Sequence, residues 1–203
     1  MVKVKVCGIT NLEDALAALF CGADALGFVF YKKSPRYISP LKAGNISRIL
    51  PKKICRVGVF VDEDIKTVKK IARLCDLNML QFHGKESAAY CRKFKGYKII
   101  KAFPVKSALD LAKVSEYGDC ACLFDTYSKH KVGGTGKKFN WNLLRKLDRI
   151  KRPFFLSGGL TIGNVRQAIK LLKPDWVDAS SALESKPGKK DHKKIKQFIQ
   201  ASR

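Results

Sequence analysis

The chain has 203 residues, a length that suits one well-buried core and is short for two, so we expect a single domain over residues 1–203. Its 41 lysines and arginines exceed its 17 aspartates and glutamates and give a formal net charge of +24. The lysines are spread over nearly every expected helix and loop, and no recognition helix, zinc finger or aromatic RNA-binding motif accompanies them. We therefore expect no specific nucleic-acid partner.

The sequence also predicts neither a membrane protein nor a metalloprotein. No apolar run approaches the length of a membrane span, and the first expected strand begins at residue 2, which leaves no room for a signal peptide. We expect a cytoplasmic protein without a membrane partner. The seven cysteines are odd in number and lack the spacing of a metal site, so we expect reduced core thiols and no bound metal.

Apolar segments rich in β-forming residues alternate with segments of helical periodicity along the chain. Strands are expected near 2–7, 24–30, 55–61, 78–82, 97–103, 119–124, 153–157 and 175–178. Helices are expected near 11–21, 41–50, 63–75, 85–94, 107–116, 140–149, 163–172 and 191–202. Eight consecutive βα units predict an α/β protein with a parallel sheet, and their number favours closure into a (β/α)8 TIM barrel. Long loops at 31–40 and 126–139 follow strands, on the face where such barrels hold their active sites.

The first strand ends on Cys7, and a turn with a helix-cap signature follows at residues 8–11. Alternation along the strand places Lys3, Lys5 and Cys7 on one face, so a cation neighbours the thiol. A thiol at the carboxyl end of a barrel strand is a candidate catalytic group. The alternative is a small buried cysteine that only completes the core.

The sixth strand ends on Asp125, a candidate general acid or base. The alternative is an aspartate that caps backbone N–H groups of the loop that follows. Cys7 and Asp125 belong to the first and sixth strands, far apart in the sequence. A closed barrel brings both residues to one rim.

Two further segments predict a phosphate site. Gly158 and Gly159 follow the seventh strand, and Ser180 and Ser181 follow the eighth, where barrels commonly bind phosphate through backbone N–H groups, hydroxyls and a helix N-terminus. We therefore expect a phosphorylated small-molecule substrate. Asp178, on the same strand face as Ser180, either contacts this substrate or pairs with Lys5 as a structural or orienting group.

Three more polar residues follow strands on the same rim. Arg36 lies in the loop after the second strand, where its guanidinium is a plausible fork for a carboxylate. A solvated surface arginine is the alternative in a chain this basic. Gln81 and His83 share a face at the end of the fourth strand, and His83 either orients substrate or bonds to the backbone.

Several short segments along the chain carry a resemblance to a known family. They are KVCGIT (5–10), GADALGFVF (22–30), SPRYI (34–38), VGVFV (57–61), QFHG (81–84), FDT (124–126), GGTG (133–136), SGGL (157–160) and VDASS (177–181). Together they resemble the phosphoribosylanthranilate isomerases of tryptophan biosynthesis. Ala182 stands where this family often has glycine, and its Cβ disfavours a positive φ.

The resemblance implies an enzyme that converts N-(5-phosphoribosyl)anthranilate to 1-(2-carboxyphenylamino)-1-deoxyribulose 5-phosphate by an Amadori rearrangement. It implies that Asp125 is the general acid that opens the ribose ring and that Cys7 is the base that removes the proton from C2. No metal or organic cofactor is implied, because the iminium intermediate serves as the electron sink. We expect a monomer or a homodimer.

Two questions stay open at this stage. A free thiol has a pKa of about 8.5 and only its thiolate is an effective base, so we hypothesise that Lys5 stabilises the thiolate. The closest rival function is another phosphate-binding barrel, such as a histidine-pathway sugar isomerase or an indole-glycerol-phosphate synthase. The first typically uses two aspartates, and the second needs a lysine acid. A basic nucleic-acid-binding or purely structural barrel is the rival from another class.

Overall fold

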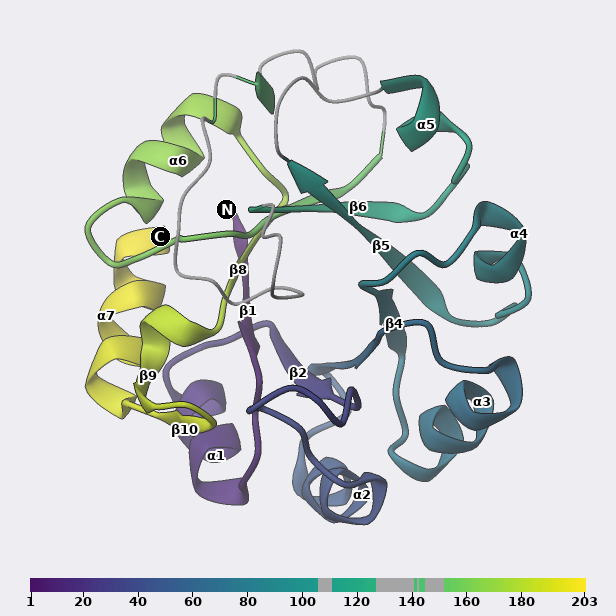
Figure 1. The fold of residues 1–203 in the computed structure, drawn as a ribbon. Coiled ribbons are helices and arrows are strands. Elements are labelled where there is room, and N and C mark those ends of the chain that lie inside the picture. Colours follow the sequence, from purple (N-terminus) through teal and green to yellow (C-terminus); the bar gives the residue numbers. More distant parts are fainter. Residues whose placement is uncertain (106–110, 127–140, 142, 145–151) are drawn as a thin grey trace.

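A computed structural model of the protein describes residues 1–105, 111–126, 141, 143–144 and 152–203. Eight strands form a closed parallel barrel in sequential order, and the first strand pairs with the eighth. They are β1 (Lys3–Cys7), β2 (Ala25–Val29), β3 (Cys55–Phe60), β4 (Met79–Phe82), β5 (Lys98–Val105), β6 (Ala121–Thr126), β7 (Phe154–Leu156) and β8 (Trp176–Ala179). Figure 1 looks along the barrel and shows the helices outside it. The predicted (β/α)8 TIM barrel is confirmed.

The helices of the described residues follow the strands in order. They are α1 (Leu12–Phe20), α2 (Pro40–Ile49), α3 (Ile65–Leu74), α4 (Ala88–Cys91), α5 (Leu111–Ser115), α6 (Val165–Leu172) and α7 (His192–Ser202). Side chains of Asn11, Ser39 and Asp64 cap the first three by accepting hydrogen bonds from backbone N–H groups. The helix expected at 140–149 and the loop expected at 126–139 lie mostly outside the described residues.

The helix predicted at 85–94 is shorter than expected, because α4 spans only Ala88–Cys91. Its predicted first turn is held in another arrangement by the buried carboxylate of Glu86. That carboxylate accepts hydrogen bonds from the backbone N–H groups of Asp62 and Gly84 and from the Lys101 ammonium, at 2.8–2.9 Å. These tertiary bonds delay the start of the helix to Ser87, whose hydroxyl caps it.

A short hairpin that was not predicted follows β8. A 3₁₀ turn, η2 (Ser181–Leu183), leads into β9 (Glu184–Lys186), which pairs antiparallel with β10 (Lys189–Lys190). The loop between them is Pro187-Gly188, and Gly188 has a φ of +81°. Proline followed by a glycine at positive φ is typical of a type II turn, so this dipeptide was the available signal. In Figure 1 the hairpin lies beside α1 and α7.

The barrel interior changes from apolar to polar along the strands. Its lower part is an apolar cluster that includes Val57, Leu123 and Phe155. Toward the carboxyl ends the interior also holds buried polar side chains such as Lys5 and Gln81, together with Val29 and Val59. The polar end of the interior is therefore the floor of the site. Within the described part of the chain, no helix combines the length and apolar character needed to cross a bilayer.

Candidate active site

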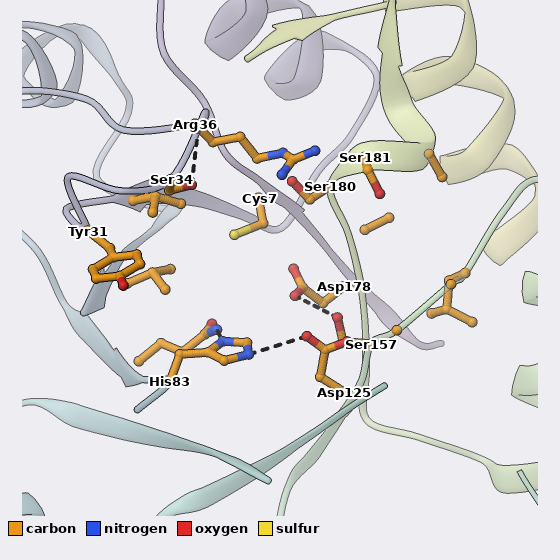
Figure 2. A pocket seen from close by; sticks show the side chains of 18 of the residues that line it. Cys7, Tyr31, Ser34, Arg36, His83, Asp125, Ser157, Asp178, Ser180 and Ser181 are labelled. Atoms are coloured by element: carbon orange, nitrogen blue, oxygen red, sulfur yellow. Dashed lines mark hydrogen bonds and ion pairs between the residues drawn. The ribbon is translucent and has the colours of Figure 1, made fainter. Parts of the chain in front are cut away.

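A single pocket at the carboxyl ends of the strands gathers every residue that the sequence singled out (Figure 2). The predicted residues that line it are Cys7, Arg36, Gln81, His83, Asp125, Gly158, Gly159, Asp178, Ser180 and Ser181. They come from six strands or the loops that directly follow them. Barrel closure thus brings together groups that are up to 174 positions apart in the sequence, from Cys7 to Ser181 (181 − 7).

Cys7 is the last residue of β1 and lies almost fully buried at the pocket floor. Its neighbour in the sheet is Gly27 of β2. A Cβ atom on Gly27 would lie 2.7 Å from the Cys7 sulfur, so the space for the thiol depends on the missing side chain. Cys7 lines the pocket and also packs in a small apolar cluster with Val29 and Val59.

Lys5 lies beside the Cys7 thiol, as hypothesised, but its ammonium also forms an ion pair with Asp178. Its ammonium is 2.8 Å from Oδ1 of Asp178, which is its register partner on the adjacent strand β8. Burial lowers the pKa of Lys5, but Asp178 and Cys7 outweigh it and raise that pKa. Burial and Asp178 raise the pKa of the Cys7 thiol, Lys5 and Lys190 lower it, and the net direction is upward.

Asp178 has both of the alternative features considered for it. It pairs with Lys5, and its second oxygen accepts a hydrogen bond of 3.2 Å from the Ser157 hydroxyl. It also lines the pocket, and in the view of Figure 2 it projects between Cys7 and Asp125. The carboxylate is thus held from both sides at the centre of the site.

A chain of polar contacts leads to Asp125. Gln81 and His83 are joined at 2.9 Å through Nε2 and Nδ1, and His83 Nε2 lies 3.2 Å from Oδ2 of Asp125. With the Gln81 amide donating to Nδ1, the neutral histidine carries its proton on Nε2 and points it at Asp125. The other Asp125 oxygen accepts from the backbone N–H of Thr126 at 2.7 Å. Asp125 thus caps that N–H and also lines the pocket.

Arg36 lines the pocket, but one edge of its guanidinium is already occupied. Nε and Nη2 donate to the two carboxylate oxygens of Glu184, each at 2.8 Å. Glu184 also faces the Lys190 ammonium at 3.0 Å, and both residues are buried. The fork that remains for a ligand carboxylate is the edge formed by Nη1 and Nη2. Sequence reasoning missed Glu184 and Lys190, because both belong to the unpredicted hairpin.

Another part of the pocket has the features of an anion site. Gly158 and Gly159 adopt positive φ values of +78° and +69°, and no acceptor for their N–H groups is found in the described part of the chain. The buried hydroxyl of Ser180 also has no partner among the described residues. Ala182 lies in η2 and is not among the described residues with positive φ, so its Cβ is accommodated.

The described residues contain no cluster of three histidine, cysteine or acidic side chains able to hold a metal ion. All seven cysteines are free thiols. Five of them are buried and two, Cys21 and Cys55, are partly exposed, so the prediction of core thiols holds for the larger part of the set.

Comparison with known proteins identifies the family. The model of the N-(5'-phosphoribosyl)anthranilate isomerase family matches residues 4–201. The chain belongs to this family. The isomerase of Trichlorobacter lovleyi is 47% identical over 199 residues, which cover 98% of this chain and 97% of that protein. The isomerase of Thermotoga maritima is 48% identical over 200 residues, with the same coverage.

Solved structures of phosphoribosylanthranilate isomerases have the same fold. The crystal structure of the Thermotoga maritima isomerase superposes with a TM-score of 0.94 at 45% identity, covering 100% of this chain and 98% of that one. A second isomerase structure holds reduced 1-(o-carboxyphenylamino)-1-deoxyribulose 5-phosphate and superposes with a TM-score of 0.91 at 45% identity, with the same coverage. The protein is thus an isomerase of tryptophan biosynthesis.

Proposed function

We propose that this isomerase works by general acid and base catalysis, with Asp125 as the acid and Cys7 as the base. Asp125 protonates the ribose ring oxygen, and the C1–O bond breaks to give an open-chain iminium. Cys7, as its thiolate, then removes the proton from C2, and the electron pair moves into the iminium to give an enolamine. Tautomerisation of the enolamine gives the ketone product.

The observation that carries this proposal is the placement of Cys7 and Asp125 around one pocket, from β1 and β6. A substrate with an anionic group at each end fits between two anion sites. The open edge of Arg36 suits the aromatic carboxylate, and Ser180, Ser181 and the backbone at Gly158 and Gly159 suit the phosphate. The ligand of the solved relative carries both of these groups. Fixing both ends holds the sugar between acid and base.

The remaining assignments follow from this reaction. Gln81 and His83 orient Asp125, and Asp178 positions Lys5 against the thiol. We propose no metal or organic cofactor, a reaction in the cytoplasm, one domain over residues 1–203 and no specific nucleic-acid partner. Among solved relatives, monomers generated from the dimeric Thermotoga maritima isomerase are known, which is consistent with a monomer or a homodimer.

The test follows the fluorescence of phosphoribosylanthranilate during turnover by purified variants. Cys7→Ala and Asp125→Asn are each expected to lower kcat by about a hundredfold or more, the usual contribution of a positioned acid or base. Circular dichroism checks that both variants fold. Cys21→Ala and Asp64→Asn, which change a partly exposed thiol and an exposed helix cap outside the pocket, serve as matched controls. Near-normal turnover in either pocket variant removes that residue from its assigned role.

A further inference from the structure

A buried charge cluster lies behind the pocket wall, where the hairpin β9–β10 meets the loop after β2. Glu184 is its centre, with two hydrogen bonds from Arg36 at 2.8 Å and the Lys190 ammonium at 3.0 Å. The side chains of Glu184 and Lys190 are 5% and 0% exposed. A buried ion pair is a weak source of stability, because removing both charges from water costs about as much as their attraction returns. The position of the pair beside the site points to a functional reason for it.

Glu184 fixes the direction of Arg36. An unrestrained arginine side chain has several flexible bonds and loses rotamer entropy when a ligand orders it. Glu184 holds the guanidinium before substrate arrives and leaves its second edge open. The stem of Arg36 is also packed against the turn after Cys7, since a Cβ on Gly8 would lie 2.8 Å from Arg36 Cδ. The carboxylate-binding group is therefore pre-organised next to the base.

Lys190 lies near both the predicted phosphate loop and the Cys7 thiol. Its ammonium lies 3.2 Å from the backbone carbonyl of Ser180, at the start of the predicted phosphate loop. Ser180 packs against the turn after Cys7, since a Cβ on Gly8 would lie 3.0 Å from the Ser180 hydroxyl, so Lys190 lies close to the base. In agreement with this placement, Lys190 lowers the pKa of the Cys7 thiol against the effect of burial. Its own pKa is lowered by burial, and Glu184 opposes that effect. Arg36 and Lys190 hold the pKa of Glu184 below its usual range despite burial.

Both lysines lower the pKa of the Cys7 thiol, Lys5 more than Lys190, and Asp178 opposes them. The ionisable groups that line the pocket or lie directly behind it, besides Cys7, are Lys5 (β1), Tyr31 and Arg36 (after β2), His83 (after β4), Asp125 (β6), Asp178 (β8), Glu184 (β9) and Lys190 (β10). Asp178 offsets Lys5 at 2.8 Å. One carboxylate, Glu184, is shared by two cations, so this cluster keeps a net positive charge beside the thiol.

We propose that Glu184 and Lys190 are positioning residues. Glu184 holds the Arg36 guanidinium for the substrate's aromatic carboxylate, and Lys190 adds to Lys5 a second positive charge that stabilises the Cys7 thiolate. The inference rests on the proposed function, in which Cys7 is the base and Arg36 binds the carboxylate. It assigns opposite electrostatic effects to two residues of one ion pair.

The test measures the rate of alkylation of Cys7 by iodoacetamide against pH, by mass spectrometry of the peptide that contains Cys7. Lys190→Met removes a positive charge and is expected to move the midpoint of this rate profile to higher pH by about one pH unit. Glu184→Gln removes a negative charge and is expected to move the midpoint to lower pH by a similar amount. Glu184→Gln also frees Arg36 and is expected to raise KM about tenfold with a smaller change in kcat.

The double variant Glu184→Gln/Lys190→Met guards against a trivial folding defect. It keeps the net charge of the cluster and replaces a buried ion pair with neutral groups of similar size, a change that proteins often tolerate. Its alkylation midpoint is expected to return close to that of the wild type, while its KM stays raised. Lys189→Met is the matched control, because Lys189 is the exposed neighbour in the same strand, and it is expected to change neither quantity.

Shifts in the same direction in both single variants, or unchanged midpoints in folded protein, overturn the inference. A double variant that keeps the midpoint of Lys190→Met overturns it as well. These results are distinct from failure of the proposed function, because alkylation does not require turnover. If Cys7→Ala retains activity while the opposite shifts appear, the catalytic role of Cys7 is wrong and the electrostatic assignment stands.

Discussion

At the scale of single residues, two glycines make room for the side chains of the site because they have no Cβ atom. Gly158 has a φ of +78°, and a Cβ there would lie 2.4 Å from the Thr126 backbone nitrogen and 2.8 Å from Oδ1 of Asp125. Gly27 makes room for the Cys7 sulfur in the same way. Each of the two proposed catalytic groups thus has a glycine beside it.

Gly158→Ala is expected to lower kcat at least about tenfold, because the new methyl group displaces Asp125 or the strand end that holds it. Gly96→Ala is the matched control, since Gly96 also has a positive φ, +88°, but no atom would lie within 4 Å of a Cβ added there. Both variants are expected to lose roughly 1 kcal/mol of unfolding free energy from backbone strain. Turnover and urea unfolding are measured together, and equal loss of kcat in both variants contradicts this explanation.

The positions of the proposed catalytic residues were predictable from the sequence for a local reason. Strand alternation and the residue that ends each apolar run are visible in a few neighbouring positions, as for Cys7 and Asp125. The partners of Arg36 were not predictable, because Glu184 is 148 positions away and only the folded hairpin brings it into contact. The Glu184 carboxylate binds one edge of the Arg36 guanidinium, an edge that the sequence-based prediction left available for substrate.

At the scale of elements, two segments differ from the prediction because tertiary hydrogen bonds hold them. The predicted helix at 85–94 loses its first turn to Glu86, which bonds to two loops and to Lys101. The hairpin β9–β10 is held by bonds to α1. Asp14 of α1, fully buried, accepts from the Lys190 N–H and from the Asn11 side chain and faces His192 Nε2 at 2.9 Å.

Asp14→Ala is therefore expected to lower the free energy of unfolding by about 3 kcal/mol, because it leaves the buried Lys190 N–H and two partly buried donors without an acceptor. Asp64→Ala is the comparison, since Asp64 is an exposed helix cap with one backbone bond to Thr67, and its loss is expected to cost about 1 kcal/mol. Urea unfolding followed by circular dichroism measures both. An Asp14 variant as stable as the Asp64 variant contradicts the role given to the buried carboxylate.

At the scale of the whole molecule, the positive charge is distributed and has no single structural cause. The described surface includes a groove between α3 and α4 whose charged lining residues are all cations. They are Lys69, Arg73, Arg92, Lys93 and Lys95. This groove lies away from the residues that line the active-site pocket. These five cations are thus separate from the active-site pocket.

A surface of this kind attracts polyanions through counterion release and without sequence preference. We expect a fluorescent oligonucleotide to bind at about 50 mM salt and to lose at least about a hundredfold in affinity by about 200 mM salt, with equal affinity for unrelated sequences. Fluorescence anisotropy across a salt series measures this. Binding that survives the higher salt, or that distinguishes sequences, contradicts the expectation of no specific nucleic-acid partner.

Closure of the barrel between β1 and β8 has a consequence for any divided form of the chain. The amino-terminal half holds the thiol, Arg36 and His83, and the carboxyl-terminal half holds Asp125 and Ser180 with its hairpin. Neither half contains both the proposed acid and the proposed base, and Glu184 of one half bonds to Arg36 of the other. We expect a chain cut between α4 and β5 to be inactive as separate fragments. Turnover that returns when the two fragments are mixed then shows that they have associated. The barrel could therefore be used as a split enzyme, in which activity measures the association of its two halves.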